Sequence, residues 1–436
     1  MKFSATVFQN EYLPQGASDV NAVVTVASEG GPPAATSADK VVVLVVDTST
    51  SMANAKIRAA RKAAATAISL LPDGTSFALV AGNHEARLVY PPPGHGIHGP
   101  VPADDVTRRD AIETVRGLDA EGGTAISTWL DLTRSLLAPF PNAIRMAYLV
   151  TDGNNEGERP ELLDQAIARA VGVFQCDTRG VGEQWHVAEL RKISSALLGE
   201  VDLIKRPEDM DEDFQAFLAR AVGKSVADVR LRIWSPKGST VKFVRQVAPS
   251  IEDLTGRATD VNDLTRDYPT GAWGGDESRD YHVAVSVPVG AVGDERLAAR
   301  VSLMVGDEQI SQALVRAVWT DDESLSTRIN PQVAHYTGQA ELAEAIQEGL
   351  EARKQGDLGT ATIKLGRAVQ LAAASGHDGT VKLLRKVVDI EDAATGTVRV
   401  KRDVAALDEM ELDTRSTRTV RVSKTPKPKP PAKAGP

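Results

Sequence analysis

Runs of apolar residues alternate with amphipathic stretches over the first half of the chain, beginning with six consecutive apolar residues at 41–46, VVVLVV. An unbroken, largely β-branched run of this kind predicts a strand buried on both faces, as in a parallel sheet. From Ala53 to Leu71 the apolar positions recur at helical spacing along one face of an alanine-rich segment. A buried strand followed directly by a helix is the repeating unit of α/β proteins.

The same alternation continues to residue 222. Further strands are predicted at 76–81, 86–90, 146–150, 171–176 and 201–204, with helices between most of them. The strands at 76–81 and 86–90 are close enough to form a hairpin, which gives the sheet one antiparallel edge. About six strands alternating with about six helices predict a doubly wound sheet over residues 39–222.

Residues 225–325 follow a different pattern, in which apolar and polar positions alternate with period two. This pattern predicts the half-buried strands of an antiparallel β-sandwich. Residues 1–30 hold two more strand-like segments, and two strands alone are marginal in water. We therefore expect residues 1–30 to complete the sandwich, so that the α/β domain is inserted in it.

One stretch of the predicted sandwich, 268–282, combines two aromatic residues, several glycines and alternating charges. One interpretation is a recognition loop. The other is that Trp273 packs on the sandwich while Glu277 pairs with Arg279 or Arg245.

The last part of the chain is first helical and then polar. Residues 330–395 show helical spacing and predict a three-helix bundle. Residues 396–436 are predicted to be a partly disordered tail with a short strand near 397–400, because the chain ends in the basic, proline-rich stretch KTPKPKPPAKAGP.

Composition narrows the functional classes. A chain of 436 residues suggests two or three domains, and its formal net charge of −9 argues against nucleic acid as the main partner. The single cysteine, Cys176, excludes an intrachain disulfide and is expected to be a buried, inert thiol. With no signal-peptide pattern at the N-terminus and no apolar run of about 20 residues, we expect a cytoplasmic protein without a membrane span.

Oxygen-bearing side chains follow three of the predicted elements. They are Asp47, Ser49 and Ser51 after the first buried strand, Thr124 in a Gly-Gly-Thr loop that opens a helix, and Asp152 at the end of the 146–150 strand. Because parallel strands bring their carboxyl ends to one edge of a sheet, these loops are expected to meet there. Hard oxygen donors without cysteine or histidine suit Mg²⁺, Mn²⁺ or Ca²⁺.

These segments, Asp47-x-Ser49-x-Ser51, Gly122-Gly123-Thr124 and Thr151-Asp152-Gly153, resemble the metal-ion-dependent adhesion site of the von Willebrand factor A (VWA) domain, in the arrangement of bacterial stand-alone VWA proteins. The resemblance covers residues 39–222. It implies a Rossmann-like VWA sheet in which Asp47, Ser49, Ser51, Thr124 and Asp152 bind Mg²⁺ (or Mn²⁺ or Ca²⁺). It also implies that a protein partner supplies an Asp or Glu to the bound ion. Thr50 stands where glycine is common in the family, a departure that leaves every donor in place.

Other interpretations stay open. The site could belong to a metal-assisted hydrolase, such as a phosphatase, but no general base is evident, so we expect a protein without catalytic residues. A metal-free scaffold, with the hydroxyls serving as helix caps, is the third hypothesis. His95 and His98 could bind zinc, although no third ligand lies near them. Glu156 and Asp177 could tune the site electrostatically or be solvated loop charges.

Overall fold

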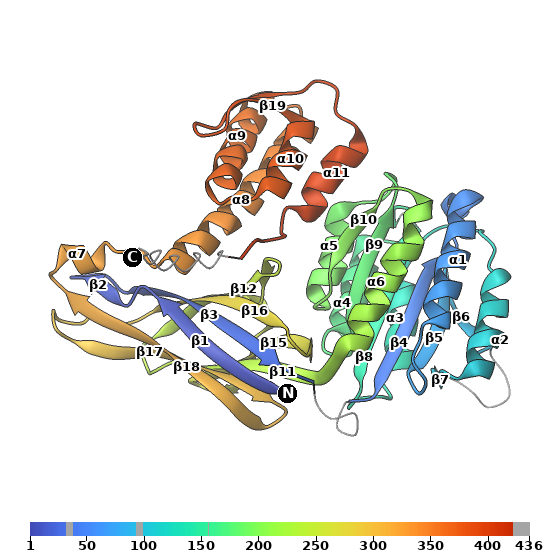
Figure 1. Ribbon diagram of the computed structural model, residues 1–436, viewed down its shortest axis with the longest axis horizontal. Helices are drawn as coiled ribbons and strands as arrows, with labels where there is room; N and C mark the ends of the chain where they lie inside the picture. The colour runs from blue at the N-terminus through green and yellow to red at the C-terminus, as the bar shows by residue number, and fades with distance from the viewer. Residues whose placement is uncertain (32–37, 93–98, 156, 422–436) are drawn as a thin grey trace, which may run out of the picture.

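The computed structural model describes residues 1–31, 38–92, 99–155 and 157–421. It contains an α/β domain and a β-sandwich, drawn on the right and left of Figure 1, and a helical region drawn above them. His95, His98, Glu156 and the basic end of the chain fall outside the described residues, so the zinc prediction and the tail prediction for 422–436 are not addressed by the structure.

A seven-stranded sheet forms the centre of the α/β domain, with the order β10-β9-β8-β4-β5-β6 and with β7 paired to β5. Pairing is parallel except at β6 and β7, so the predicted hairpin is present. The strands are β4 (Lys40–Asp47), β5 (Ser76–Gly82), β6 (Ala86–Tyr90), β7 (Val101–Pro102), β8 (Ile144–Thr151), β9 (Gln175–Val181) and β10 (Val201–Ile204).

Helices cover both faces of this sheet because β4 is apolar on both sides. Val42, Leu44 and Val46 pack in one hydrophobic cluster with α1, α2 and α6, and the alternate valines pack in another with α3, α4 and α5. The helices are α1 (Ala55–Ser69), α2 (Asp105–Arg116), α3 (Ile126–Leu137), α4 (Pro160–Ala170), α5 (Val187–Ala196) and α6 (Met210–Gly223).

The prediction of a strand at 171–176 was wrong in register, because β9 begins at Gln175 and runs to Val181. It therefore carries Asp177 and Arg179 into the buried sheet. The Arg179 side chain is only 3% exposed, and its Nε lies 2.7 Å from Oδ1 of Asp213 on α6. A buried charge is tolerated when it is paired, and the partner here is distant in sequence, so local hydropathy could not place this strand.

Two sheets form the sandwich, in the orders β1-β3-β16-β12-β13 and β14-β15-β11-β17-β18-β2. They share one hydrophobic core that includes Trp273, Tyr281 and Trp319. The strands are β1 (Lys2–Gln9), β2 (Tyr12–Pro14), β3 (Asp19–Glu29), β11 (Lys224–Trp234), β12 (Thr240–Ala248), β13 (Glu252–Asp253), β14 (Thr259–Asn262), β15 (Thr265–Gly274), β16 (Ser278–Ser286), β17 (Glu295–Val305) and β18 (Glu308–Thr320).

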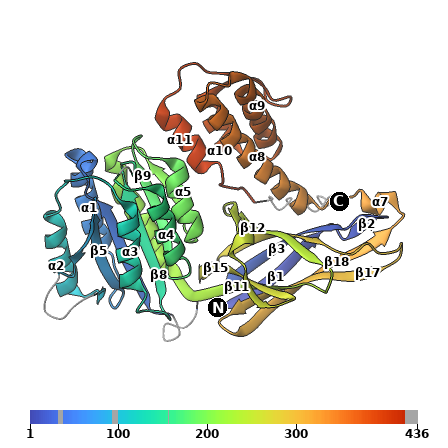
Figure 2. The same cartoon turned by 180° about the vertical axis from the view of Figure 1, so that it is seen from behind.

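The N-terminal strands pair with strands from the later half of the chain. β3 lies antiparallel to β16, whereas β2 lies parallel to β18, so the sandwich is not purely antiparallel. In chain order the α/β domain stands between β3 and β11, and Figure 2 shows β1 and β3 running next to each other in the sandwich.

The stretch 268–282 forms most of the β15–β16 hairpin. Trp273 is fully buried, and Oε2 of Glu277 lies 2.8 Å from Nη2 of Arg279, which also stacks on the Trp273 ring. Packing on the sandwich, rather than a free recognition loop, accounts for these residues.

The helical region consists of α7 (Glu323–Ser326), α8 (Pro331–Lys354), α9 (Leu358–Ala374) and α10 (Asp378–Val387), followed by the hairpin β19 (Val388–Asp392) and β20 (Thr397–Val400) and by α11 (Ala406–Arg415). The short strand predicted near 397–400 is present as β20. The prediction of a partly disordered tail beyond it needs correction, because α11 is folded. Leu412 of α11 is buried in the same cluster as Leu350, Leu365 and Leu384. The final apolar positions are too sparse to show this helix from periodicity alone.

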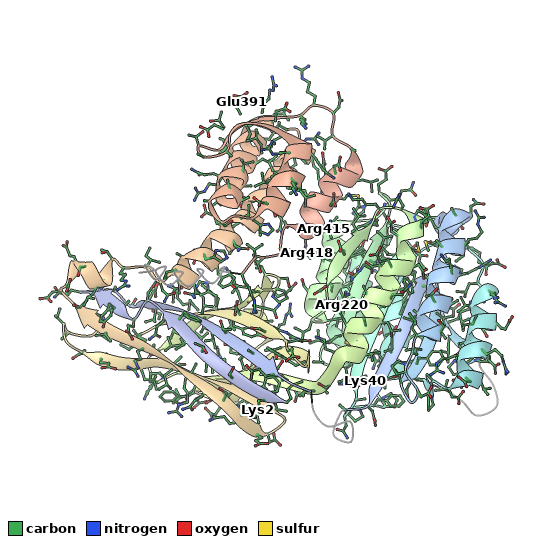
Figure 3. The ribbon with its side chains drawn as sticks, in the orientation of Figure 1. Lys2, Lys40, Arg220, Glu391, Arg415 and Arg418 are labelled. Atoms are coloured by element: carbon green, nitrogen blue, oxygen red, sulfur yellow. The ribbon has the colours of Figure 1, made fainter. Side chains whose placement is uncertain are left out.

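Residues 411–421, which we call the C-terminal segment, contact all three parts of the protein. Nε of Arg415 lies 3.2 Å and Nη2 of Arg418 lies 2.5 Å from the carboxylate of Asp202 on β10. The backbone of Thr419 donates to the carbonyl of Pro249 in the sandwich, and that of Val420 donates to Gln339 on α8. Arg415 and Arg418 are labelled at this junction in Figure 3.

Acidification should destabilise the sandwich through His282, which is 6% exposed and whose Nε2 donates to Oδ1 of Asn21 at 3.0 Å. Burial, assisted by Arg245, lowers the pKa of His282 to about 4. Between pH 6.5 and 4 the His282 imidazole is therefore protonated in the unfolded chain but neutral in the folded protein. The free energy of unfolding should fall by about 3 kcal/mol as the pH drops from about 6.5 to 4. Urea unfolding across this range should show a smaller loss for His282→Gln than for wild type. The exposed His84→Gln variant should behave like wild type, and an unchanged loss in His282→Gln would contradict the assignment.

Asp202→Asn should loosen the C-terminal segment. Burial alone would raise the pKa of Asp202, but the guanidinium groups of Arg418 and Arg415 hold it below its usual value. Removing the charge should lower the free energy of unfolding by about 2 kcal/mol. The effect is no larger because both arginines are partly exposed, and solvent screens the pairs. Mass spectrometry of a limited trypsin digest should show faster cleavage after Arg415 and Arg418. Asp19→Asn, which removes a surface pair with Lys242, is the matched control.

Candidate metal centre

The centre lies at the carboxyl edge of the α/β sheet, which is the upper edge in Figure 3, opposite Lys40 at the start of β4. β4 ends at Asp47, a short loop and a 3₁₀ turn (Thr50–Met52) follow, and α1 begins at Ala55. All six valine and leucine positions of β4 are buried, so the strand fixes the position of Asp47 firmly.

Asp47 is fully buried, and both of its carboxylate oxygens accept hydrogen bonds. The backbone amide of Ser49 donates to Oδ1 at 2.7 Å, and the hydroxyl of Thr151 at the end of β8 donates to Oδ2 at 2.5 Å. Burial raises the pKa of Asp47 to about 6, although the hydrogen bonds from Ser49 and Thr151 act in the opposite direction. Asp47 therefore orients the loop and joins two strand ends, and it adds negative charge beneath the serine hydroxyls.

Ser49, Ser51 and Asp152 form a chain of side chains across the site. Oγ of Ser49 lies 2.9 Å from Oγ of Ser51, and the Ser51 hydroxyl donates to Oδ1 of Asp152 at 2.6 Å. Two adjacent ligands of an octahedral Mg²⁺ ion are about 2.9 Å apart, so the two hydroxyls already have the spacing that the ion requires. Because Ser51 gives its proton to Asp152, its lone pairs remain available to a cation.

Thr124 reaches the same space from another loop. A Cβ on Gly153 would lie 3.1 Å from Oγ of Ser51 and 3.4 Å from Oγ1 of Thr124, so both hydroxyls face the position that Gly153 leaves without a side chain. All five oxygen-bearing residues predicted from the sequence are thus gathered at one point, and their chemistry and spacing fit a hard divalent cation.

Backbone contacts hold the loops of Ser51 and Thr124 together. The Thr50 amide donates to the carbonyl of Gly122 at 2.9 Å, and its hydroxyl donates to the same oxygen at 3.0 Å. The Glu121 amide donates to the carbonyl of Thr48 at 2.7 Å. Gly122 has φ of +79°, a conformation that favours glycine. Thr50, the departure from the family pattern, therefore serves as a link between loops.

Two residues that the sequence analysis did not single out, Asn155 and Glu158, hold the segment that follows Thr124. Asn155 accepts the amide of Ile126 at 2.9 Å, and Glu158 accepts the amide of Ser127 at 2.9 Å, so these side chains cap the start of α3. Their position a few residues beyond Asp152 is a weak signal that could have been noticed.

Lys56 is the most important residue that sequence reasoning missed. It is the second residue of α1, its side chain is 25% exposed, and its ammonium group is ion-paired with Oδ2 of the fully buried Asp152. Its place one turn beyond Met52 on a predicted helix was the only available signal.

The remaining candidates do not belong to this centre. Asp177 is the third residue of β9, toward the opposite edge of the sheet, and Nη2 of Arg220 lies 3.0 Å from its carboxylate. Cys176 is buried, as expected, and burial raises the pKa of its thiol well above the usual value.

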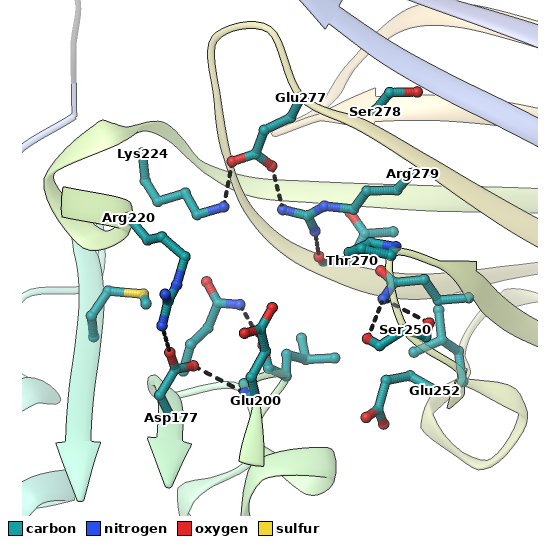
Figure 4. Close-up of a pocket in the computed structure, with 17 residues that line it drawn as sticks. Asp177, Glu200, Arg220, Lys224, Ser250, Glu252, Thr270, Glu277, Ser278 and Arg279 are labelled. Atoms are coloured by element: carbon teal, nitrogen blue, oxygen red, sulfur yellow. Dashed lines mark hydrogen bonds and ion pairs between the residues drawn. The ribbon is translucent and has the colours of Figure 1, made fainter. Parts of the chain in front are cut away.

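A cavity of about 260 Å³ lies between the α/β domain and the sandwich, and Asp177 and Arg220 line it (Figure 4). On its other wall Glu277 is ion-paired with Lys224 and Arg279. The negative charges of Asp177 and Glu277 are therefore balanced by the arginine and lysine side chains that line the same cavity. The cavity is separate from the metal centre.

Two parts of the chain match known family profiles. Residues 42–155 match the von Willebrand factor type A domain, and residues 370–416 match the von Willebrand factor type A C-terminal domain. The second match spans the end of α9, α10, the β19–β20 hairpin and α11, which the sequence analysis had not connected with this family.

Comparison with known proteins extends the likeness to the whole chain. The solved structure of von Willebrand factor type A from Catenulispora acidiphila is 48% identical, covers 97% of each chain and superposes with a TM-score of 0.91. The ArnB paralog VWA2 from Sulfolobus acidocaldarius shares the fold at 14% identity, with a TM-score of 0.59 over 96% of this chain and 98% of that one. An uncharacterised protein of Synechocystis sp. is 27% identical over 219 residues, and this chain spans about half (49%) of that relative's length. The chain belongs to the von Willebrand factor A family.

Proposed function

We propose that this protein is a metal-dependent protein-interaction module. In this proposal Asp47, Ser49, Ser51, Thr124 and Asp152 hold a divalent cation, with Mg²⁺ preferred over Mn²⁺ or Ca²⁺. An Asp or Glu side chain of a protein partner completes the coordination of the ion. VWA domains commonly act as metal-dependent protein-interaction modules, and membership of this family supports the same general role for this chain.

The observation that carries the proposal is the 2.9 Å spacing of the Ser49 and Ser51 hydroxyls, with Thr124 facing the same gap. These donors are neutral, and Asp47, whose two oxygens already accept hydrogen bonds from Ser49 and Thr151, would act on the ion partly through water. A cation held mainly by neutral oxygens keeps most of its charge, so it would supply a strong attraction for an external carboxylate.

The setting of the site is consistent with a protein partner. The formal net charge of −9 disfavours nucleic acid. No helix in the described part of the chain is long and apolar enough to cross a membrane. We place the protein in the cytoplasm in this proposal, because its single cysteine is a free, buried thiol that suits a reducing compartment.

Thr124→Val should weaken cation binding without unfolding the protein. Valine matches threonine in shape, and the lost hydroxyl faces the site, so we expect at least about a tenfold rise in the Mn²⁺ dissociation constant. Titration calorimetry, together with electron paramagnetic resonance of free Mn²⁺, measures this directly. Thr128→Val is the matched control, because that hydroxyl donates to the carbonyl of Ala125, the residue that precedes α3. Equal Mn²⁺ affinity in Thr124→Val and wild type would remove Thr124 from the ligand set.

Partner binding should depend on the same site. Pull-downs from a lysate of the source organism are carried out under three conditions: wild type in Mg²⁺, wild type in EDTA, and Thr124→Val in Mg²⁺. The sets of captured proteins are then compared. We expect one set of proteins captured only by wild type in Mg²⁺, with Asp47→Ala losing the same set while retaining its circular dichroism spectrum. Capture that persists in EDTA and in both variants would refute the proposed function.

The proposed function is binding and not catalysis. Around the site, the Lys56 ammonium is occupied by Asp152 and the Asp47 carboxylate by Ser49 and Thr151, so neither is a free general base. Hydrolysis of p-nitrophenyl phosphate with Mn²⁺ should therefore not exceed that of the Asp152→Ala variant. Turnover that requires Asp152 would favour a metal-assisted hydrolase instead.

A further inference from the structure

Lys56 brings a positive charge to a centre whose proposed role is to bind another one. Its ammonium group contacts Oδ2 of Asp152, while Oδ1 of Asp152 accepts the Ser51 hydroxyl. Asp152 has no exposed surface of its own, so Lys56 is the group that compensates its buried charge.

Two other cations of α1 are directed elsewhere. Nη2 of Arg61 pairs with Asp119 at 2.7 Å, and Nζ of Lys62 lies 3.5 Å from Asp211. Lys56 alone among these three reaches the metal centre. Its position early in α1, directly after the loop that carries Ser49 and Ser51, keeps the ammonium close to the proposed ion.

We infer that Lys56 is a tethered cation that sets the charge of the centre, weakening metal binding and strengthening the binding of a carboxylate to the loaded site. This inference rests on the proposed function. With Asp47 and Asp152 ionised and Lys56 protonated, the centre carries one net negative charge. A divalent cation would then make it net positive by one charge, whereas without Lys56 the loaded centre would be neutral.

Two consequences follow from this charge balance. The ion meets electrostatic repulsion from Lys56, so it binds less tightly than the five oxygen-bearing residues alone would allow. The excess positive charge of the loaded centre favours an anion, so metal and carboxylate should bind with positive coupling, and each should raise the affinity of the other. Lys56 would thereby restrict stable metal loading to conditions in which an acidic partner is present.

The test compares Mn²⁺ binding to wild type, Lys56→Met, Lys56→Arg and the control Lys62→Met, using calorimetry and electron paramagnetic resonance at low ionic strength. Methionine keeps an unbranched, largely apolar side chain and removes the charge, arginine keeps the charge, and Lys62 is an exposed lysine on the same helix. We expect Lys56→Met to bind Mn²⁺ about tenfold or more tightly than wild type, and Lys56→Arg and Lys62→Met to stay within about threefold. Circular dichroism verifies folding, and Lys56→Gln replaces Lys56→Met if the latter is unfolded.

A second measurement repeats the titrations with sodium acetate at constant ionic strength. Acetate should increase the Mn²⁺ affinity of wild type more than that of Lys56→Met. Mn²⁺ binding by wild type together with equal or weaker binding by Lys56→Met would overturn the role of Lys56 and leave the proposed function standing. Failure of every protein to bind Mn²⁺ at millimolar concentration would overturn both. Binding by Lys56→Met but not by wild type would support the inference, because the lysine would then exclude the ion by itself.

Discussion

The buried carboxylate of Asp47 is the group on which the geometry of the centre depends. It ends the central strand β4, accepts the amide of Ser49 and the hydroxyl of Thr151, and so ties the first loop to the end of β8. A carboxylate with no access to water must have both oxygens satisfied, and this requirement fixes the path of the chain on either side. These hydrogen bonds hold the backbone beneath the serine hydroxyls and so maintain their spacing.

Much of this centre could be predicted from the sequence because its signals are local. The buried run of β4 and the strand before Asp152 were visible as apolar segments, and parallel strand ends must meet at one edge. The β9 register and α11 could not be predicted in the same way. β9 carries Arg179, whose partner Asp213 lies on another element, and α11 is held by long-range ion pairs, such as Lys205 with Glu411. Hydropathy records burial of apolar groups but not compensation of charge between distant residues.

Asn155, Glu158 and Lys56 could not be identified from the sequence, again because their contacts are with distant segments. Asn155 and Glu158 bind the first amides of α3, and Lys56 binds Asp152, so each acts on a group contributed by another segment of the chain. A motif of ligand types shows which atoms meet an ion, but it carries no information about the charge around them. In this centre that charge depends on a lysine whose neighbours in sequence are ordinary helix residues.

Glycines both hold the loops of the metal centre in place and keep the space between its hydroxyls free of side chains. Gly157 packs so closely that a Cβ would lie 2.3 Å from the carbonyl oxygen of Thr124, and its amide donates to that oxygen at 2.8 Å, so the Thr124 loop is held from behind. Gly123 has no neighbour within 4 Å of a Cβ position, and Gly153 leaves the space between the Ser51 and Thr124 hydroxyls unfilled. The partner carboxylate of the proposed function could approach only if that space stays clear, and the hydroxyls hold their spacing only if the loops around it are fixed. The hydrogen bonds between the loops meet the second condition, and the missing side chains meet the first.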